Sequence, residues 1–124
     1  MSDLSSLSYL IVDDVSSVRV FLRQTLVHME VTEIYEASCG ADALDAFKKH
    51  IPDVVFLDIE LPDSDGQEIL KQIRSIKSNA FVVMVSAHST VDIVKYSLSH
   101  GAAGFIVKPF SPKKITTILK KFQG

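Results

Sequence analysis

Short apolar runs rich in β-branched residues alternate along this chain with stretches whose apolar residues recur every three or four positions. The first pattern is typical of buried strands and the second of amphipathic helices. The expected strands are residues 9–12, 32–37, 54–57, 81–85 and 104–107. The expected helices are about residues 16–28, 41–49, 67–75 and 90–99, and a last one from Pro112 with Ser111 as its N-cap. One strand–helix unit repeated five times predicts a parallel sheet with helices on both faces.

The apolar content of each strand predicts its place in the sheet. The runs at 9–12, 54–57 and 81–85 are apolar on both faces, as central parallel strands are. The run at 32–37 contains Glu33 and Glu36 and is typical of an edge strand. This pattern favours an α/β fold with a doubly wound, five-stranded parallel sheet in the order 2-1-3-4-5.

The helices are expected to bury one face each and to end at recognisable signals. Gly101 is expected to follow the end of the fourth helix as its C′ residue. The expected inward residues are Val18, Phe21, Leu22, Thr25, Leu26 and Met29 in the first helix, Leu44 and Phe47 in the second, Ile69, Leu70, Ile73 and Ile76 in the third, and Ile115, Ile118, Leu119 and Phe122 in the last.

The run from Val54 to Leu57 stops at a carboxylate, Asp58, and organises the rest of the chain. Leu61-Pro62 cannot continue a strand because proline has no amide donor, and residues 63–66 (Asp-Ser-Asp-Gly) form a typical turn. Asp58 is therefore expected at the carboxyl end of a central strand, where open α/β sheets place their ligands.

Other polar residues follow the remaining strands at the same edge of the sheet. Asp13 and Asp14 follow the first strand, Ser86 the fourth and Lys108 the fifth. Because the carboxyl ends of parallel strands meet at one edge, these residues and Asp58 are expected to share one pocket.

Three neighbouring carboxylates require a positive partner, since each close pair costs on the order of 1 kcal/mol in water and more in a protein. Oxygen ligands without histidine or thiolate suit Mg²⁺ or Mn²⁺. Lys108 supplies a second positive charge, and the Ser86 hydroxyl can donate and accept hydrogen bonds. These groups suit phosphoryl transfer with Asp58 as the nucleophile, giving an aspartyl phosphate.

This series of Asp-Asp, Asp, Ser and Lys-Pro closely resembles the receiver domain of two-component response regulators, especially the single-domain chemotaxis type, with its flavodoxin-like three-layer α/β/α sandwich. The resemblance covers residues 9–122. It implies that Asp13, Asp14, Asp58 and the backbone carbonyl of Glu60 hold Mg²⁺. It also implies that Asp58 accepts phosphate from a sensor histidine kinase or a histidine phosphotransfer protein, and that Ser86 and Lys108 bind the phosphoryl group.

The same resemblance implies how the signal leaves the site. The bond from Lys108 to Pro109 is expected to be cis, and Phe105 is expected to be the aromatic switch that responds to Ser86. The implied output face consists of the fourth helix, fifth strand and fifth helix, where a protein target would bind. Such a module is not an enzyme, although it takes part in its own phosphorylation and autodephosphorylation, and it is a monomer or a weak phosphorylation-dependent dimer.

Glu60 and His88 each lie two residues beyond a site residue, beside the expected path of an attacking water. We expect them to tune the lifetime of the phosphoryl group. Glu60 either orients that water or repels the phosphoryl group and slows loading, and the sequence leaves both open.

Composition restricts the function further. The 124 residues match one domain, taken as 1–124, with 47% hydrophobic and 23% charged residues. A net charge of −2 offers no field for nucleic acid, no apolar run reaches the roughly 20 residues of a membrane span, and the start from Met1 lacks the features of a signal peptide. The single cysteine, Cys39, agrees with a cytoplasmic location.

Four alternatives to a stand-alone receiver share parts of this pattern. An aspartyl-phosphate phosphohydrolase would usually have a second aspartate two residues after the nucleophile, where this chain has Glu60. An FMN-binding module is disfavoured because Asp13-Asp14 would repel the phosphate. A receiver that folds but is not phosphorylated is disfavoured because every motif residue is present. The chain also fits the N-terminal receiver of a longer response regulator whose output domain lies outside this sequence.

Overall fold

The computed structural model describes residues 3–122, so Met1 and Gly124, the ends of the expected 1–124 domain, lie outside the described residues. Its five strands are β1 (Ser8–Val12), β2 (Glu33–Ala37), β3 (Val54–Asp58), β4 (Phe81–Ser86) and β5 (Gly104–Val107). Each lies within one residue of the expected bounds. The apolar runs therefore located all five strands.

The helices also follow the predicted pattern. They are a short 3₁₀ turn η1 (Leu4–Ser6), then α1 (Ser16–His28), α2 (Gly40–His50), α3 (Gly66–Ile76), α4 (Val91–Ser99) and α5 (Pro112–Leu119). Gly101 adopts a φ of +97° directly after the C-cap of α4, as expected of a C′ glycine. Thr90 is the N-cap of α4, and its hydroxyl accepts a hydrogen bond from the amide of Ile93.

The sheet is parallel, with the order β2-β1-β3-β4-β5, which confirms the predicted doubly wound fold. β1 and β3 are neighbours, with Val12 paired to Leu57. Asp58 pairs with Val85 of β4, one residue before Ser86. The chain reverses its winding between β1 and β3, so the ends of these two strands open into the crevice where ligands bind in such sheets.

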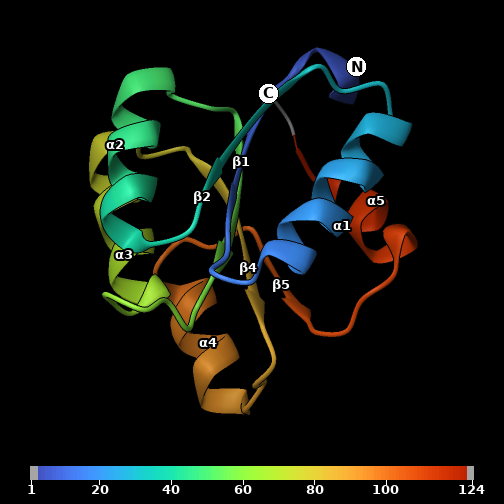
Figure 1. The fold of residues 1–124 in the computed structure, drawn as a ribbon. Helices are drawn as coiled ribbons and strands as arrows, with labels where there is room; N and C mark the ends of the chain where they lie inside the picture. Colours follow the sequence, from blue (N-terminus) through green and yellow to red (C-terminus); the bar gives the residue numbers. More distant parts are fainter. Residues whose placement is uncertain (1–2, 123–124) are drawn as a thin grey trace.

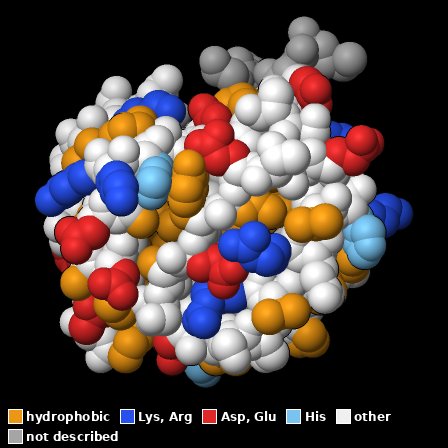
Figure 2. All heavy atoms as spheres, turned by 45° about the horizontal axis from the view of Figure 1, so that its top comes forward, with side chains coloured by type: hydrophobic (Ala, Val, Ile, Leu, Met, Phe, Trp, Pro, Cys, Tyr) orange, Lys and Arg blue, Asp and Glu red, His pale blue; other side chains and the backbone are white. Residues whose placement is uncertain are grey.

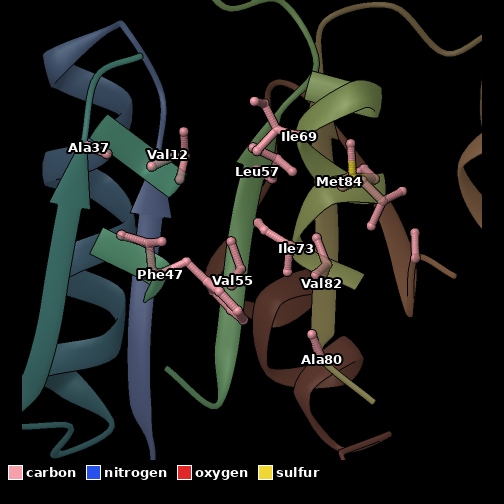
Figure 3. Close-up of a cluster of buried hydrophobic side chains, with 14 of the residues drawn as sticks. Val12, Ala37, Phe47, Val55, Leu57, Ile69, Ile73, Ala80, Val82 and Met84 are labelled. Atoms are coloured by element: carbon pink, nitrogen blue, oxygen red, sulfur yellow. The ribbon is translucent and has the colours of Figure 1, made fainter. Parts of the chain in front are cut away.

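Two apolar layers cover the sheet. In Figure 1, α2 and α3 lie on one side of the sheet and α1 and α5 on the other. Figure 3 shows the first layer, in which Val12, Val55, Leu57 and Met84 point from the strands toward α2 and α3. The second layer joins α1 and α5 to the opposite face, through Tyr9, Ile11, Phe56, Leu26 and Ile115 among others. These layers fix the strand ends that support the site.

Two details of the expected helices were wrong. Ile76 was expected to face inward but is 39% exposed, because it is the last residue of α3 and Ile73 already fills the core position one turn earlier. The last helix ends at Leu119, so Phe122 lies beyond it, although its ring still packs edge-to-face against Phe81. Ser111 is the N-cap residue of α5, as expected, but its side chain makes no capping hydrogen bond.

On the face shown in Figure 2, Lys and Arg side chains lie among Asp and Glu side chains, and hydrophobic side chains form small separate groups. This mixture agrees with the nearly balanced charge of the chain. Within residues 3–122, no helix has the length and apolar character needed to cross a membrane.

Candidate functional site

Asp58 is the last residue of β3 and is almost fully buried, at 2% exposure. One carboxylate oxygen, Oδ1, accepts a hydrogen bond from the amide of Glu60 over 3.1 Å. The other, Oδ2, accepts one from Lys108 Nζ over 3.3 Å. The turn that follows β3 is held tightly against it, since the amide of Gly66 donates to the carbonyl of Ile59 over 2.7 Å.

Asp13 follows β1 and is also buried, whereas Asp14 is exposed. The amide of Asp13 donates to the carbonyl of Ala37, and its Oδ1 accepts from the amide of Val15 over 2.9 Å. One carboxylate oxygen from each of Asp13, Asp14 and Asp58 lies within 4.8 Å of the other two. The structure thus brings together the three carboxylates that the sequence predicted, in an arrangement that could hold a metal ion.

Lys108 lies between two of these carboxylates. Its ammonium is 2.8 Å from Asp13 Oδ2 and 3.3 Å from Asp58 Oδ2. The peptide bond from Lys108 to Pro109 is cis, as the family resemblance implied. Burial acts to lower the pKa of Lys108, but the contact with Asp13 and the charges of Asp58 and Asp13 outweigh burial and raise it above its ordinary value.

The buried carboxylates leave a negative charge that Lys108 does not fully balance. Burial raises the pKa of Asp58 to about 6, and the neighbouring Asp13 carboxylate adds to this rise while Lys108 opposes it. Asp13 Oδ2 is buried, and Lys108 Nζ, 2.8 Å away, supports it as an ion pair rather than as a well-directed hydrogen bond. A divalent cation fits these observations, since carboxylate oxygens are its preferred ligands and it would supply the missing positive charge.

Ser86 ends β4 opposite Glu60 and is fully buried. Its hydroxyl donates to Glu60 Oε2 over 2.9 Å and accepts from the amide of His88 over 3.0 Å. The Nδ1 atom of His88 lies 3.6 Å from the same Glu60 oxygen, and both side chains are largely exposed. Ser86, Glu60 and His88 therefore form one connected group at the mouth of the site.

Phe105 lies on β5, where it pairs with Met84 of β4. Its side chain is half-buried and packs against the apolar layer under α2 and α3. The amide of Lys108, three residues further on, donates to the carbonyl of Ser86 over 2.8 Å. This backbone bond connects the strand that contains Phe105 directly to the end of β4.

Sequence reasoning missed two residues around the site. Asp63 caps helix α2 from the loop after β3, since its carboxylate accepts from the amides of Gly40 and Ala41 over 2.7 and 3.0 Å. These bonds lower the pKa of Asp63. Arg19 of α1 donates to the carbonyl of Asp13. The sequence did contain one indication of the Asp63 contact. Cys39 is a weak N-cap for α2, and its sulfur accepts only a long 3.5 Å contact from the amide of Asp42.

The comparison with protein families agrees with this geometry. The family model for the response regulator receiver domain matches residues 9–120 of the chain. The chain belongs to this family. Receiver domains are the regulated modules of two-component systems and are generally non-enzymatic signalling modules.

Among its relatives, this receiver is 37% identical over 112 residues to the chemotaxis protein CheY of Bacillus subtilis, covering 90% of this chain and 93% of CheY. It is 35% identical over 113 residues to sporulation initiation phosphotransferase F of the same species, covering 91% and 90% of the two chains. A chain in the crystal structure of the CheX–CheY–BeF3–Mg²⁺ complex from Borrelia burgdorferi superposes with a TM-score of 0.90 and 34% identity, covering 95% of this receiver and 90% of that chain.

Proposed function

We propose that this receiver accepts a phosphoryl group on Asp58 from a phosphohistidine of a sensor histidine kinase or a histidine phosphotransfer protein. The observation that supports this most directly is the meeting of Asp13, Asp14 and Asp58 with Lys108 at the carboxyl ends of three strands. A buried carboxylate, an ammonium and a hydroxyl around one opening are what a transient acyl phosphate needs.

Asp13, Asp14 and Asp58, with the backbone carbonyl of Glu60, would hold Mg²⁺ or Mn²⁺. When bound, the ion neutralises charge on the carboxylates and on the incoming phosphoryl oxygens. The acidic cluster of this chain supports such an ion, as does the Mg²⁺ in the related CheX–CheY complex from Borrelia burgdorferi.

In the transfer step, a carboxylate oxygen of Asp58 attacks phosphorus, a P–O bond forms and the P–N bond to the donor histidine breaks. The electron pair of that bond stays on the donor imidazole, which takes up a proton from solvent. Lys108, already 3.3 Å from Asp58 Oδ2, stabilises negative charge on the phosphoryl oxygens. The Ser86 hydroxyl donates to one of these oxygens after it leaves Glu60.

The phosphodonor has an apolar surface to dock against beside the site. A cavity of about 590 Å³ opens between the start of α1 and the loop after β5, lined by Val18, Phe21, Pro109, Phe110 and Lys108 among others. Its apolar lining suits a protein partner, and Lys108 links it to the carboxylates. A donor seated there would bring its phosphohistidine to Asp58.

The output target would bind the face formed by α4, β5 and α5. A groove of about 520 Å³ lies along β5 and α5, where Phe105 and Val107 adjoin Lys113, Lys114 and Lys121. Phosphorylation of Asp58 would change this face through Ser86, the backbone bond to Lys108 and the strand that contains Phe105. Lys95 and Tyr96 of α4 belong to the same proposed face.

We further infer that the receiver works in the cytoplasm as a monomer or weak phosphorylation-dependent dimer, and that it acts on a protein target without binding nucleic acid itself. The alternative function, an aspartyl-phosphate phosphohydrolase, needs a free acid–base group next to Asp58. Glu60 has its carboxylate tied to Ser86 and close to His88, which favours the receiver over the hydrolase.

The experiment that tests this proposal combines the protein with acetyl phosphate and Mg²⁺ and measures its intact mass. We expect the mass of one phosphoryl group to appear on the wild type and not on Asp58→Asn, and to require the metal. Asp45→Asn, which removes an exposed aspartate on α2, is the matched control and should be phosphorylated normally. Absence of the added mass from the wild type would contradict the proposal, and turnover of phosphomonoesters would favour the hydrolase.

A further inference from the structure

The Arg19 side chain of α1 contacts the backbone of the acidic site rather than a carboxylate of the cluster. Its Nη1 atom donates to the carbonyl oxygen of Asp13 over 2.5 Å. Its Nε atom donates to Glu36 Oε1 of β2 over 3.1 Å. The guanidinium thus joins three segments: the first turn of α1, the edge strand β2 and the loop that holds Asp13.

This contact completes the support of the Asp13 backbone. On one side, the Asp13 amide donates to the carbonyl of Ala37 at the end of β2. On the other, the Asp13 carbonyl accepts from Arg19. Only the carboxylate then remains to face the site, with Oδ1 held by Val15 and Oδ2 beside Lys108.

A cation so close to a metal site would normally oppose metal binding, but here Glu36 offsets part of its charge. Glu36 accepts from Arg19 with one oxygen and from Arg23 with the other, over 2.6 Å. The Arg19 side chain is the less exposed of the two arginines, at 19% against 43%. Glu36 therefore offsets part of the charge of the two arginines and holds the Arg19 guanidinium so that Nη1 points toward the Asp13 carbonyl.

We propose that Arg19 is a positioning residue that fixes Asp13 for divalent-cation binding, and that Glu36 holds Arg19 in place and offsets its charge. This inference rests on the proposed function, because it assigns a role toward the same cation. Groups that orient metal ligands from behind typically change metal affinity 10–100-fold when they are removed. Arg19 acts in this way on the backbone of a ligand.

Arg23 provides a matched control, because it also pairs with Glu36. Arg19→Gln and Arg23→Gln each remove one positive charge next to that carboxylate. By charge alone, either substitution would tighten binding of a cation to the cluster, and Arg19→Gln more so because it lies closer. The loss of positioning would instead weaken cation binding, and it applies to Arg19→Gln but not to Arg23→Gln. Of the two arginines, Arg19 alone bonds to Asp13, so Arg19→Gln should weaken Mg²⁺ binding and Arg23→Gln should not.

The experiment titrates Mg²⁺ into the intact, unphosphorylated protein by calorimetry, at low ionic strength and near neutral pH. We expect Kd to rise about tenfold or more for Arg19→Gln and to stay within about twofold of wild type, or to fall, for Arg23→Gln. Glu36→Gln should also raise Kd, because it leaves two arginines uncompensated. Amide NMR shifts of Asp14 and Val15 in EDTA should change in Arg19→Gln and not in Arg23→Gln.

Each outcome decides between the two ideas. A Kd for Arg19→Gln at or below that of wild type would overturn the positioning role, as would equal weakening by both arginine variants. Melting in EDTA shows whether each variant is folded. Arg19→Lys replaces Arg19→Gln if that variant does not fold, because it keeps the charge but has one flexible ammonium in place of the planar fork that reaches Asp13 and Glu36 from two separate nitrogens. Arg19→Lys is then expected to weaken Mg²⁺ binding as well, and unchanged affinity would contradict the proposal. If the wild type itself does not bind Mg²⁺, the proposed function fails, and this inference fails with it.

Discussion

Ser86 Oγ donates a hydrogen bond to Glu60 Oε2 over 2.9 Å. This single proton is the one that the proposed function requires for a phosphoryl oxygen on Asp58. Glu60 and an incoming phosphoryl group therefore compete for the same hydroxyl. The acidic residue two positions after Asp58 acts as a substitute acceptor in the unphosphorylated state, and the competition makes Glu60 the natural place to begin testing the site.

Replacing Glu60 should speed phosphorylation of Asp58 by acetyl phosphate. Glu60→Ala removes both the competing acceptor and a negative charge near the incoming phosphoryl group. With a net hydrogen-bond contribution of about 1 kcal/mol, we expect a rate increase of about fivefold. Glu60→Gln keeps an acceptor for Ser86 without the charge, so it separates the two effects. Rates measured by intact mass over time should rank Ala above Gln above wild type, and a slower Glu60→Ala variant would show that Glu60 assists loading.

The lifetime of the phosphoryl group should depend on Glu60 and His88 together. Both side chains are largely exposed beside Ser86, and His88 Nδ1 lies 3.6 Å from Glu60 Oε2. We expect the water that attacks the acyl phosphate to approach beside these two side chains. Replacing both with alanine should therefore change the half-life of phosphorylated protein after the phosphodonor is removed. An unchanged half-life would exclude both residues from the control of autodephosphorylation.

Ser86→Ala should still be phosphorylated at Asp58, although more slowly because the hydroxyl no longer assists, and phosphorylation should have a weaker effect on β5. The hydroxyl is lost, whereas Lys108 and the carboxylates stay in place. Amide NMR shifts at Phe105 and Lys113 on adding acetyl phosphate and Mg²⁺ should shrink in this variant. Ser86→Thr, which retains a hydroxyl, serves as the control and should respond like wild type. Full shift changes in Ser86→Ala would mean that the signal reaches β5 by another route.

The sequence predicted which residues meet at the carboxyl edge of the sheet because their positions follow from topology. Strand ends can be located from apolar runs, and a parallel sheet brings Asp13, Asp58, Ser86 and Lys108 to one edge whatever their side-chain conformations. The contacts that depend on side-chain direction could not be predicted in this way. The bond from Ser86 to Glu60 depends on how an exposed side chain folds back, and sequence spacing gives no information on that.

Contacts between segments far apart in the sequence were missed for a related reason. Asp63 lies in a turn, and turn aspartates usually cap the helix that follows them, which here is the role of Asp65 toward Gln67. Asp63 instead caps the N-terminus of α2, which lies more than twenty residues earlier in the sequence. Arg19 resembled any exposed residue on an amphipathic helix, because a helical pattern does not reveal a backbone carbonyl beside it.

Removing the charge of Asp58 should stabilise the metal-free protein. Its folded-state pKa of about 6 lies above the ordinary value of 3.8, so the folded state binds the proton more tightly than the unfolded state does. The wild type should therefore lose stability as pH rises from about 4 to about 6, by up to about 3 kcal/mol. Asp58→Asn should not show this loss. Urea unfolding in EDTA at several pH values measures both curves, with Asp45→Asn as the control.

The two proteins should converge below about pH 4, where Asp58 is protonated even in the unfolded chain. If the free energies of unfolding of wild type and Asp58→Asn ran parallel between about pH 4 and about pH 6, the Asp58 carboxylate would titrate in the folded state as it does in the unfolded chain. Adding Mg²⁺ should reverse the order near neutral pH, because a bound cation stabilises the ionised cluster of the wild type and Asp58→Asn lacks one of its ligands.

A methyl group at position 66 should disturb the site by displacing the backbone of Asp58. A Cβ added to Gly66 would lie 2.1 Å from the carbonyl oxygen of Asp58, which is backbone and cannot turn aside. A Cβ added to Gly40 would lie equally close to Ser64 Oγ, which is a side-chain atom that can rotate away. We therefore expect Gly66→Ala to lower the free energy of unfolding by about 1–3 kcal/mol and Gly40→Ala by clearly less. Urea unfolding compares them, and because the Asp58 backbone must move, Gly66→Ala should also slow phosphorylation of Asp58. Equal stability of the two variants would mean that the turn after β3 yields as easily as a serine side chain.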